Sequence, residues 1–186
     1  MSERTKIESP RLQRLAEEVR QGDTGATASF WEEMTESGTP LIEPIEGETD
    51  RSLVTFLWRA TERVGGVDVI SLVTGLRDNA LQLLPGTDVW HRSWPVASDV
   101  RATYQFFPRT GGPAEDASAM ARLASYVHDP LNRHTYTFER DEEDPDGFEL
   151  VRSVLRMPKA AAQPLNERGA DVSAGTIEMH LSLIHI

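Results

Sequence analysis

The sequence contains no cysteine among its 186 residues. A disulfide framework and a thiolate-ligated metal site are therefore both excluded. We expect a protein of the reducing cytoplasm, although a periplasmic protein without cysteine would have the same composition. With 39% hydrophobic and 26% charged residues, the chain resembles an ordinary globular domain that folds without disulfides.

Long apolar runs and clusters of basic residues are also missing. No stretch approaches the roughly 20 apolar residues that a membrane-spanning helix needs. The N-terminal stretch MSERTKIESPRLQRLAEE carries charges where a signal peptide has its apolar segment. The formal net charge of −11 would repel the phosphates of nucleic acids. The sequence therefore predicts neither a membrane protein nor a nucleic-acid-binding protein.

Residues 1–48 are predicted to form a helical leader. Ser9-Pro10 supplies an N-cap and a proline at the first helical position, and Gly22 supplies a stop. Apolar residues follow the cap at helical spacing: Leu12, Leu15, Ala16 and Val19. A second helix is predicted to begin at the hydroxyl cap Ser29 and to end at Gly38.

Strands are predicted over the next part of the chain. Branched and aromatic residues dominate 53–59 and 67–74, and Gly65-Gly66 between them predicts a turn that joins the two as an antiparallel pair. Two further strands are predicted at 88–94 and 100–107, the second from its alternation of apolar and polar residues. Consecutive strands without a helix between them indicate a β-sandwich rather than a parallel sheet.

The C-terminal half is predicted to contribute smaller elements. A short helix inserted in a loop of the sandwich is expected at 115–127, with one apolar face made by Met120, Leu123, Ala124 and Val127. Residues 136–139 and 148–157 are expected to add edge strands. The stretch 158–175 has the composition of a linker.

No catalytic site is predicted. The nearest approach to the G-x-S-x-G turn of a serine hydrolase is Asp171–Gly175, which lacks the first glycine and lies in the predicted linker. The run HDPLNRH, with His128 and His134, has the spacing of neither a helical nor a strand metal site, so we expect a surface turn there. The acidic run Asp141–Gly147 has Ser153 where a calcium loop needs a bidentate glutamate, so a solvated hairpin turn is expected. The sequence therefore predicts no catalytic residue, no metal ligand and no cofactor.

The candidates for substrate binding are Trp94 and Arg101. Tryptophans 58, 90 and 94 on neighbouring strands would form a stacking platform for an aromatic or sugar ligand, or they would fill the core. We favour the core for Trp58 and Trp90, and both roles stay open for Trp94, which precedes Pro95 at a strand end. Arg101 would pair with a ligand carboxylate or, as we favour, with an aspartate of an adjoining strand.

Four motifs occur in a characteristic order: Gly86-Thr-Asp-Val-Trp90, Arg101-Ala-Thr-Tyr-Gln-Phe-Phe-Pro108, Asp129-Pro-Leu-Asn132, and Ser153-Val-Leu-Arg-Met-Pro158 with Gln163-Pro164. With the strand at 54–59, they resemble the N-terminal domain of enterochelin (ferric enterobactin) esterases over nearly all of residues 50–180. One departure is Arg133, where the family commonly continues the Asp-Pro-Leu-Asn run with proline.

The resemblance implies an all-β fold: an immunoglobulin-like β-sandwich over residues 49–157, with the helical leader before it and the short inserted helix. Residues 158–175 would be an interdomain linker, and 176–180 would begin an α/β-hydrolase domain that carries the catalytic serine, histidine and acid. In this family, the hydrolase domain cleaves the trilactone of ferric siderophores and releases iron in the cytoplasm. The chain's partners would therefore be a ferric siderophore and its own hydrolase domain.

The ending Leu181-Ser-Leu-Ile-His-Ile186 is expected to mark a break in the sequence. It can be back-translated into the inner end of a transposase adapter used to prepare sequencing libraries, and the resemblance fades where it begins. An edge strand is the alternative. We therefore expect a fragment that stops before its catalytic domain and is inactive alone, with the sandwich covering one side of the active-site cleft.

Two other functions stay open at this point. A carbohydrate-binding-like accessory sandwich of a glycan-processing enzyme would suit a tryptophan platform. A stand-alone partner-binding module is disfavoured, because the chain ends within an apparent strand. The acidic balance also suits an anionic iron–catecholate complex poorly, so attraction would have to come from the hydrolase domain or from local arginines.

Overall fold

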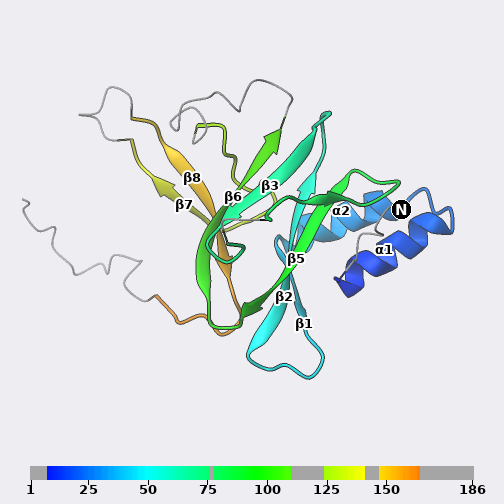
Figure 1. Ribbon diagram of the computed structural model, residues 1–186, viewed down its shortest axis with the longest axis horizontal. Coiled ribbons are helices and arrows are strands. Elements are labelled where there is room, and N and C mark those ends of the chain that lie inside the picture. The colour runs from blue at the N-terminus through cyan, green and yellow to red at the C-terminus, as the bar shows by residue number, and fades with distance from the viewer. Residues whose placement is uncertain (1–7, 76–77, 110–123, 141–146, 164–186) are drawn as a thin grey trace, which may run out of the picture.

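A computed structural model of the chain describes residues 8–75, 78–109, 124–140 and 147–163 (Figure 1). This part of the chain is mostly β, with two helices at its N-terminal end. Its elements are α1 (Pro10–Arg20), α2 (Ala26–Ser37), β1 (Leu41–Pro44), β2 (Arg51–Arg59), β3 (Gly66–Ser71), β4 (Gln82–Leu83), β5 (Val89–Ala97), β6 (Arg101–Arg109), β7 (Thr135–Phe138) and β8 (Leu150–Arg156).

The strands form two four-stranded antiparallel sheets. The first sheet has the order β1-β2-β5-β4, and the second has the order β3-β6-β8-β7. Buried side chains from both sheets form one inner core: Val54, Phe56, Val67, Val69, Leu81, Val96, Tyr104, Phe106, Leu155 and Met157. The structure is therefore compatible with the predicted all-β sandwich.

Strand β2 is buried on both of its faces. Val54 and Phe56 belong to the inner core, whereas Leu57 belongs to a second cluster shared with the two helices. We call this second group the helix-side cluster: Leu12, Leu15, Ala26, Phe30, Trp31, Met34, Leu57, Leu84 and Val89. Figure 1 shows α1 and α2 beside β1, β2 and β5, on the side away from β6 and β8. Burial of both faces explains why β2 has an apolar run instead of a strict alternation.

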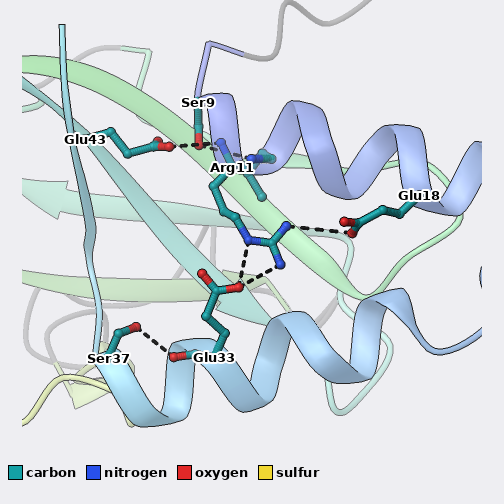
Figure 2. A network of polar contacts seen from close by, with 7 residues as sticks. Ser9, Arg11, Glu18, Glu33, Ser37 and Glu43 are labelled. Atoms are coloured by element: carbon teal, nitrogen blue, oxygen red, sulfur yellow. Dashed lines mark hydrogen bonds and ion pairs between the residues drawn. The ribbon is translucent and has the colours of Figure 1, made fainter.

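Arg11 ties the helices to each other and to the first sheet (Figure 2). Its guanidinium donates to Glu33 Oε2 of α2 at 2.8 Å and lies 3.8 Å from Glu18 Oε2 of α1. Its backbone N–H donates to Glu43 Oε1 of β1 at 2.9 Å. Polar contacts at the rim thus add to the apolar contacts that hold the leader helices on the sandwich.

The predicted helix ends are confirmed at Ser9, Gly22 and Gly38 and wrong at Ser29. The Ser9 hydroxyl caps α1 by accepting the backbone N–H of Leu12 at 3.2 Å, and Gly38 ends α2. The predicted start at Ser29 is wrong, because α2 begins at Ala26. The backbone N–H of Gly25 donates to Asp23 Oδ1 at 2.8 Å, and this turn starts the helix one turn earlier.

The predicted antiparallel pairing of 53–59 with 67–74 is wrong. β2 pairs with β1 and β5, whereas β3 pairs with β6 in the other sheet. A hairpin would require a free edge of β2, but β1 and β5 occupy both of its edges. The loop at 60–65 therefore crosses from one sheet to the other.

The structure adds two strands that the sequence did not predict, and it moves a third. β1 lies within the predicted helical leader, and β4 is only two residues long. Such short strands carry almost no periodic signal. β7 lies at an edge as predicted, but β8 lies between β6 and β7 and is not an edge strand.

Several predictions fall on residues outside the described ranges. Most of the predicted inserted helix, 115–123, lies outside the described residues, and its predicted last residue, Val127, instead forms an antiparallel bridge with Phe106. The acidic turn at 141–147 is outside except for its last residue. The linker is described only as far as Gln163, and both 176–180 and 181–186 lie beyond it. The proposed domain divisions therefore stay predictions.

The substitution Leu15→Ala should lower the free energy of unfolding by about 2–5 kcal/mol, because the lost side chain would leave a cavity in the helix-side cluster. Urea unfolding followed by circular dichroism would measure the change. Leu72→Ala is the matched control, since Leu72 is 90% exposed, and it should change the free energy by less than about 0.5 kcal/mol. Equal effects of the two substitutions would contradict tight packing of α1 on the sandwich.

Candidate functional site

A buried hydrogen-bonded cluster joins β6, β8 and the loop before β7. The Tyr104 hydroxyl donates to Asp129 Oδ2 at 2.7 Å and accepts from Asn132 Nδ2 at 2.9 Å. The Ser153 hydroxyl accepts the backbone N–H of Asp129 at 2.7 Å. All four residues are buried, with Asp129 only 1% exposed. We call them the Tyr104 cluster.

The Asp129 carboxyl has donors for both of its oxygens. Oδ2 accepts from Tyr104, and Oδ1 accepts the backbone N–H of Leu131 at 3.0 Å. Burial raises the pKa of Asp129, and its hydrogen bonds, chiefly the one from Tyr104, oppose that rise. Burial also raises the pKa of Tyr104 well above its usual value, so this hydroxyl keeps its proton and acts as the donor.

The prediction of a plain surface turn for the run HDPLNRH is wrong at its centre. Asp129 and Asn132 are buried, while His128 and His134 at the two ends are exposed. The Asp-Pro-x-Asn pattern was the available signal, because these side chains accept backbone N–H groups two residues on. Asn132 Oδ1 does so with His134 at 2.7 Å.

Arg133 connects this loop to helix α2. Its guanidinium donates to the backbone oxygen of Thr35 at 3.2 Å and to that of Glu36. These carbonyls belong to the last turn of α2, where helical partners are missing and the helix dipole is negative. Arg133 therefore fastens the loop to the leader.

The outer face of the second sheet carries a groove of about 670 Å³, which we call the arginine groove. It lies over β6, β8 and β7, and Arg133, which lines it, also contacts the last turn of α2. The register places Arg101 opposite Arg156 and Thr103 opposite Val154. The lining residues are Arg101, Ala102, Thr103, Arg133, His134, Thr135, Tyr136, Phe138, Val154, Arg156 and Gln163.

The arginine groove is basic although the chain is acidic. The whole sequence has 30 aspartates and glutamates against 19 lysines and arginines. The lining of the groove nevertheless includes Arg101, Arg133 and Arg156 and no carboxylate. Within the described ranges, no carboxylate lies within 4.0 Å of these three guanidinium groups. The groove can therefore attract an anion locally.

The partners of Arg101 differ from the favoured prediction. Its guanidinium donates to Gln163 Oε1 and to the backbone oxygen of Ala161, the latter at 2.9 Å. An aspartate partner is wrong, because the residue opposite Arg101 on β8 is Arg156. Arg101 stays a candidate for ligand binding, since it lines the groove.

Two aromatic rings stand at the end of the groove on edge strand β7. Tyr136 is 54% exposed and Phe138 is 44% exposed. Their centroids are 4.8 Å apart in an edge-to-face arrangement, and the guanidinium of Arg152 lies 5.2 Å from the Phe138 centroid. The groove thus combines cations with accessible rings.

Trp94, the other predicted candidate, lies elsewhere. It is on β5 of the first sheet and lines a separate recess with His91 and Pro95. Its ring is edge-on to Phe56 at 5.7 Å, so that it packs partly against the inner core. The structure therefore does not bring Trp94 and Arg101 together.

The other predicted platform residues pack as favoured. Trp58 and Trp90 are directly opposite each other on β2 and β5, and both pack against the inner core. Trp58 is edge-to-face with Phe106 at 5.3 Å. The tryptophans of the sandwich therefore contribute to its core and do not form a flat exposed surface.

The Gly86–Trp90 motif is a turn that holds the helices. Gly86 has φ of +80°, and a Cβ there would lie 3.1 Å from Val19 of α1. Asp88 accepts from the Trp31 indole at 2.7 Å and from Arg59 at 3.1 Å. This motif therefore supports the fold.

A second recess, of about 410 Å³, is mainly apolar, and Trp58, Tyr126 and Phe148 contribute to its lining.

In the described part of the chain, no three histidines or acids are grouped closely enough to hold a metal ion. None of the helices described above is long and apolar enough to cross a membrane.

The family described as "Enterochelin esterase, N-terminal" matches residues 53–166. The iron(III) enterobactin esterase of Yersinia enterocolitica is 37% identical over 211 aligned residues, which cover 100% of this chain and 56% of that relative. The iron(III) salmochelin esterase of Escherichia coli O6:H1 is 28% identical over 127 residues, 64% of this chain and 31% of the relative. The chain thus spans about half of the first relative and less of the second.

Solved structures share the fold. The enterobactin esterase of Shigella flexneri, crystallised in the presence of 2,3-dihydroxy-N-benzoyl-serine, has a TM-score of 0.56 at 22% identity, over 80% of this chain and 40% of that one. The ferric enterobactin esterase of Salmonella typhimurium has a TM-score of 0.51 at 24% identity, over 74% of this chain and 38% of that one. At this identity, the similarity supports the fold alone.

The substitution Tyr104→Phe should lower the free energy of unfolding by about 1–3 kcal/mol, because the Asp129 carboxyl would lose a donor while staying buried. Tyr136→Phe removes the same hydroxyl from an exposed ring and should have little effect. Thermal and urea unfolding of the two variants would measure the difference. Equal stabilities would rule out a supporting role for the Tyr104 cluster.

His91 should make the protein less stable in acid. It is 3% exposed, its Nε2 has no hydrogen-bond partner, and burial lowers its pKa to about 4. The His91 side chain is protonated near pH 6.5 in the unfolded chain but only near pH 4 in the folded chain. The neutral, buried His91 therefore contributes fully to the free energy of unfolding above pH 6.5, and this contribution is lost as the pH falls towards 4. The loss is roughly 3 kcal/mol at most.

The comparison of His91→Gln with the parent chain at pH 7 and pH 4.5 would isolate this contribution. The variant should lose less unfolding free energy between the two pH values than the parent chain. His134→Gln, at an exposed histidine, is the control and should leave the pH dependence as it is. An unchanged pH dependence in His91→Gln would contradict the assignment.

Proposed function

The chain belongs to the enterochelin esterase N-terminal family, and we propose that it is the accessory domain of an esterase that hydrolyses ferric enterobactin-type siderophores and thereby releases iron. The observation that carries this proposal is the family match over residues 53–166, which spans the sandwich from β2 to the end of β8. The relatives whose names specify iron(III) enterobactin and salmochelin esterases support the same substrate class.

We propose that a partner α/β-hydrolase domain catalyses the hydrolysis of the ester. A serine nucleophile needs a base within hydrogen-bond reach. The buried Ser153 instead accepts the backbone N–H of Asp129, and the described residues place no histidine on its hydroxyl. Ser153 therefore has no base to activate it, and we propose that the chain alone does not cleave the ester.

The sandwich is proposed to cover one side of the cleft of that hydrolase domain. Helices α1 and α2 cover part of the outer face of its first sheet through the helix-side cluster, so this part is already used for packing. Within the described residues, no helix covers the outer face of the second sheet, which carries the arginine groove. This face supports the role better than the strand ends at Trp94 and Phe107, since Trp94 packs partly into the inner core and Phe107 stacks edge-on against Tyr126.

We also propose that the sandwich is immunoglobulin-like. Strand order supports this relation, since β1-β2-β5-β4 and β3-β6-β8 follow the two sheets A-B-E-D and C-F-G of a constant-type immunoglobulin domain. β7 would then be an insertion between the last two of these strands.

The proposed compartment is the cytoplasm, with which the cysteine-free composition is compatible. The carbohydrate-binding alternative is less well supported, because the tryptophans that would form its platform pack against the inner core.

A domain exchange tests the proposed function. Residues 1–175 of this chain would replace the matching part of the Yersinia enterocolitica relative, and release of dihydroxybenzoyl-serine from ferric enterobactin would be followed by chromatography. The chimera should keep kcat/KM within about tenfold of the relative, whereas the hydrolase part alone should lose more than about tenfold.

The control chimera carries an unrelated immunoglobulin domain in place of this chain and should behave as the hydrolase part alone. The 186-residue chain by itself should release no product. Full activity of the isolated hydrolase part would overturn the accessory role.

A further inference from the structure

We propose that the arginine groove binds an aromatic carboxylate, with the carboxylate at Arg156 and the ring on the side of Tyr136. The inference deepens the proposed function, on which its link to an aromatic siderophore rests. The binding itself is argued from the charge, exposure and strand register of the groove residues.

The first argument is an uncompensated pair of cations. Arg101 and Arg156 are directly opposite on β6 and β8, and like charges at such positions repel each other. No carboxylate of the described residues lies close enough to either one to form an ion pair. A bound anion would relieve this repulsion, so the groove should favour a negatively charged ligand.

The second argument identifies the arginine that is available to a ligand. The Arg101 guanidinium is held by Gln163 and Ala161, and that of Arg133 is held by the end of α2. The Arg156 side chain is exposed and makes no hydrogen bond or ion pair within the described ranges. Its planar guanidinium can bind both oxygens of one carboxylate, while the two fixed arginines add positive potential around it.

The third argument distinguishes an aromatic anion from a simple one. Tyr136 and Phe138 line the same groove, and both rings are largely exposed on strand β7. The register places Tyr136 opposite Arg152 and Phe138 opposite Leu150, so both rings point to the outer face of the sheet, as Arg156 does. Exposed rings beside cations suit a flat ligand that carries both a ring and a charge.

Size and overall charge narrow the ligand further. The groove volume of about 670 Å³ lies within the roughly 300–1,000 Å³ of small-molecule sites. A polyanion would meet the field of a chain with net charge −11 outside the groove. A ligand with one carboxylate would be attracted mainly by the local arginines, so it fits better than a polyanion.

Binding of 2,3-dihydroxybenzoate to the 186-residue chain, followed by amide shifts in ¹H–¹⁵N spectra, tests this proposal. The shifts should be centred on residues 133–138 and 151–156. Arg156→Gln should weaken binding by at least about tenfold, because it removes a charge-assisted bidentate contact. Tyr136→Leu should weaken it by about two- to tenfold, because it removes the ring contact.

Three controls make the outcome decisive. Arg63→Gln removes an exposed arginine in the 60–65 loop, far along the chain from the groove, and should leave the affinity unchanged. Catechol has the ring without the charge and acetate has the charge without the ring, and each should bind at least about tenfold more weakly than the aryl carboxylate. Unaltered amide spectra outside the groove would show that the variants fold.

Three results would overturn the proposal: equal binding by Arg156→Gln, equal binding of acetate, or shifts centred on the recesses at Trp94 or Trp58. The chimera keeps this inference separable from the proposed function. An active chimera without aryl carboxylate binding would remove the groove site and leave the accessory role. Specific binding in the groove together with an inactive chimera would remove the accessory role and leave the groove site.

Discussion

A carboxyl group that is 1% exposed must find its hydrogen-bond donors inside the protein, and at Asp129 this requirement organises one end of the sandwich. The hydroxyl of Tyr104 reaches it from β6, and Ser153 accepts its backbone N–H from β8. The loop before β7 can then follow only one path, because Asn132 is bound to the same hydroxyl. This constraint places the next two residues, Arg133 and His134, at the edge of the second sheet.

The two outer faces of the sandwich have different roles because of what covers them. On the first sheet, the helix-side cluster buries Leu57 and Val89, and Arg11 and Asp88 add polar contacts at its rim. The second sheet has no described helix over it, and the lining of its groove includes three arginines together with Tyr136 and Phe138. Although the chain has a net charge of −11, its basic groove on this face would favour the binding of an anion. The helical leader therefore belongs to the packed structure, and the arginine groove lies on the other sheet.

Local signals predicted local features well. The Ser9 cap, the Gly38 stop and the strands β2, β5 and β6 could be located because caps, glycines and branched residues act through neighbours in sequence. The prediction of strand pairing was wrong where the pairing depended on the rest of the fold. The Gly65-Gly66 step resembled a hairpin turn, yet both edges of β2 were taken by strands from elsewhere in the chain. The groove was predicted only in part. The sequence indicates Arg101 as a candidate, but its neighbours in the groove come from two strands about thirty and fifty residues further along the chain.

The amino-acid sequence by itself determined the family, the β-rich class and the absence of thiol chemistry, because motif order, branched-residue content and composition are properties of the chain alone. Only the tertiary structure decided that the Asp-Pro-Leu-Asn run is a buried support and not a surface turn, and that Arg101 faces Arg156 and not an aspartate. The physical reason is that burial and cross-strand register depend on which distant segments fill the space beside a residue. A groove with arginines and aromatic rings on its wall exists only once β6, β8 and β7 lie side by side.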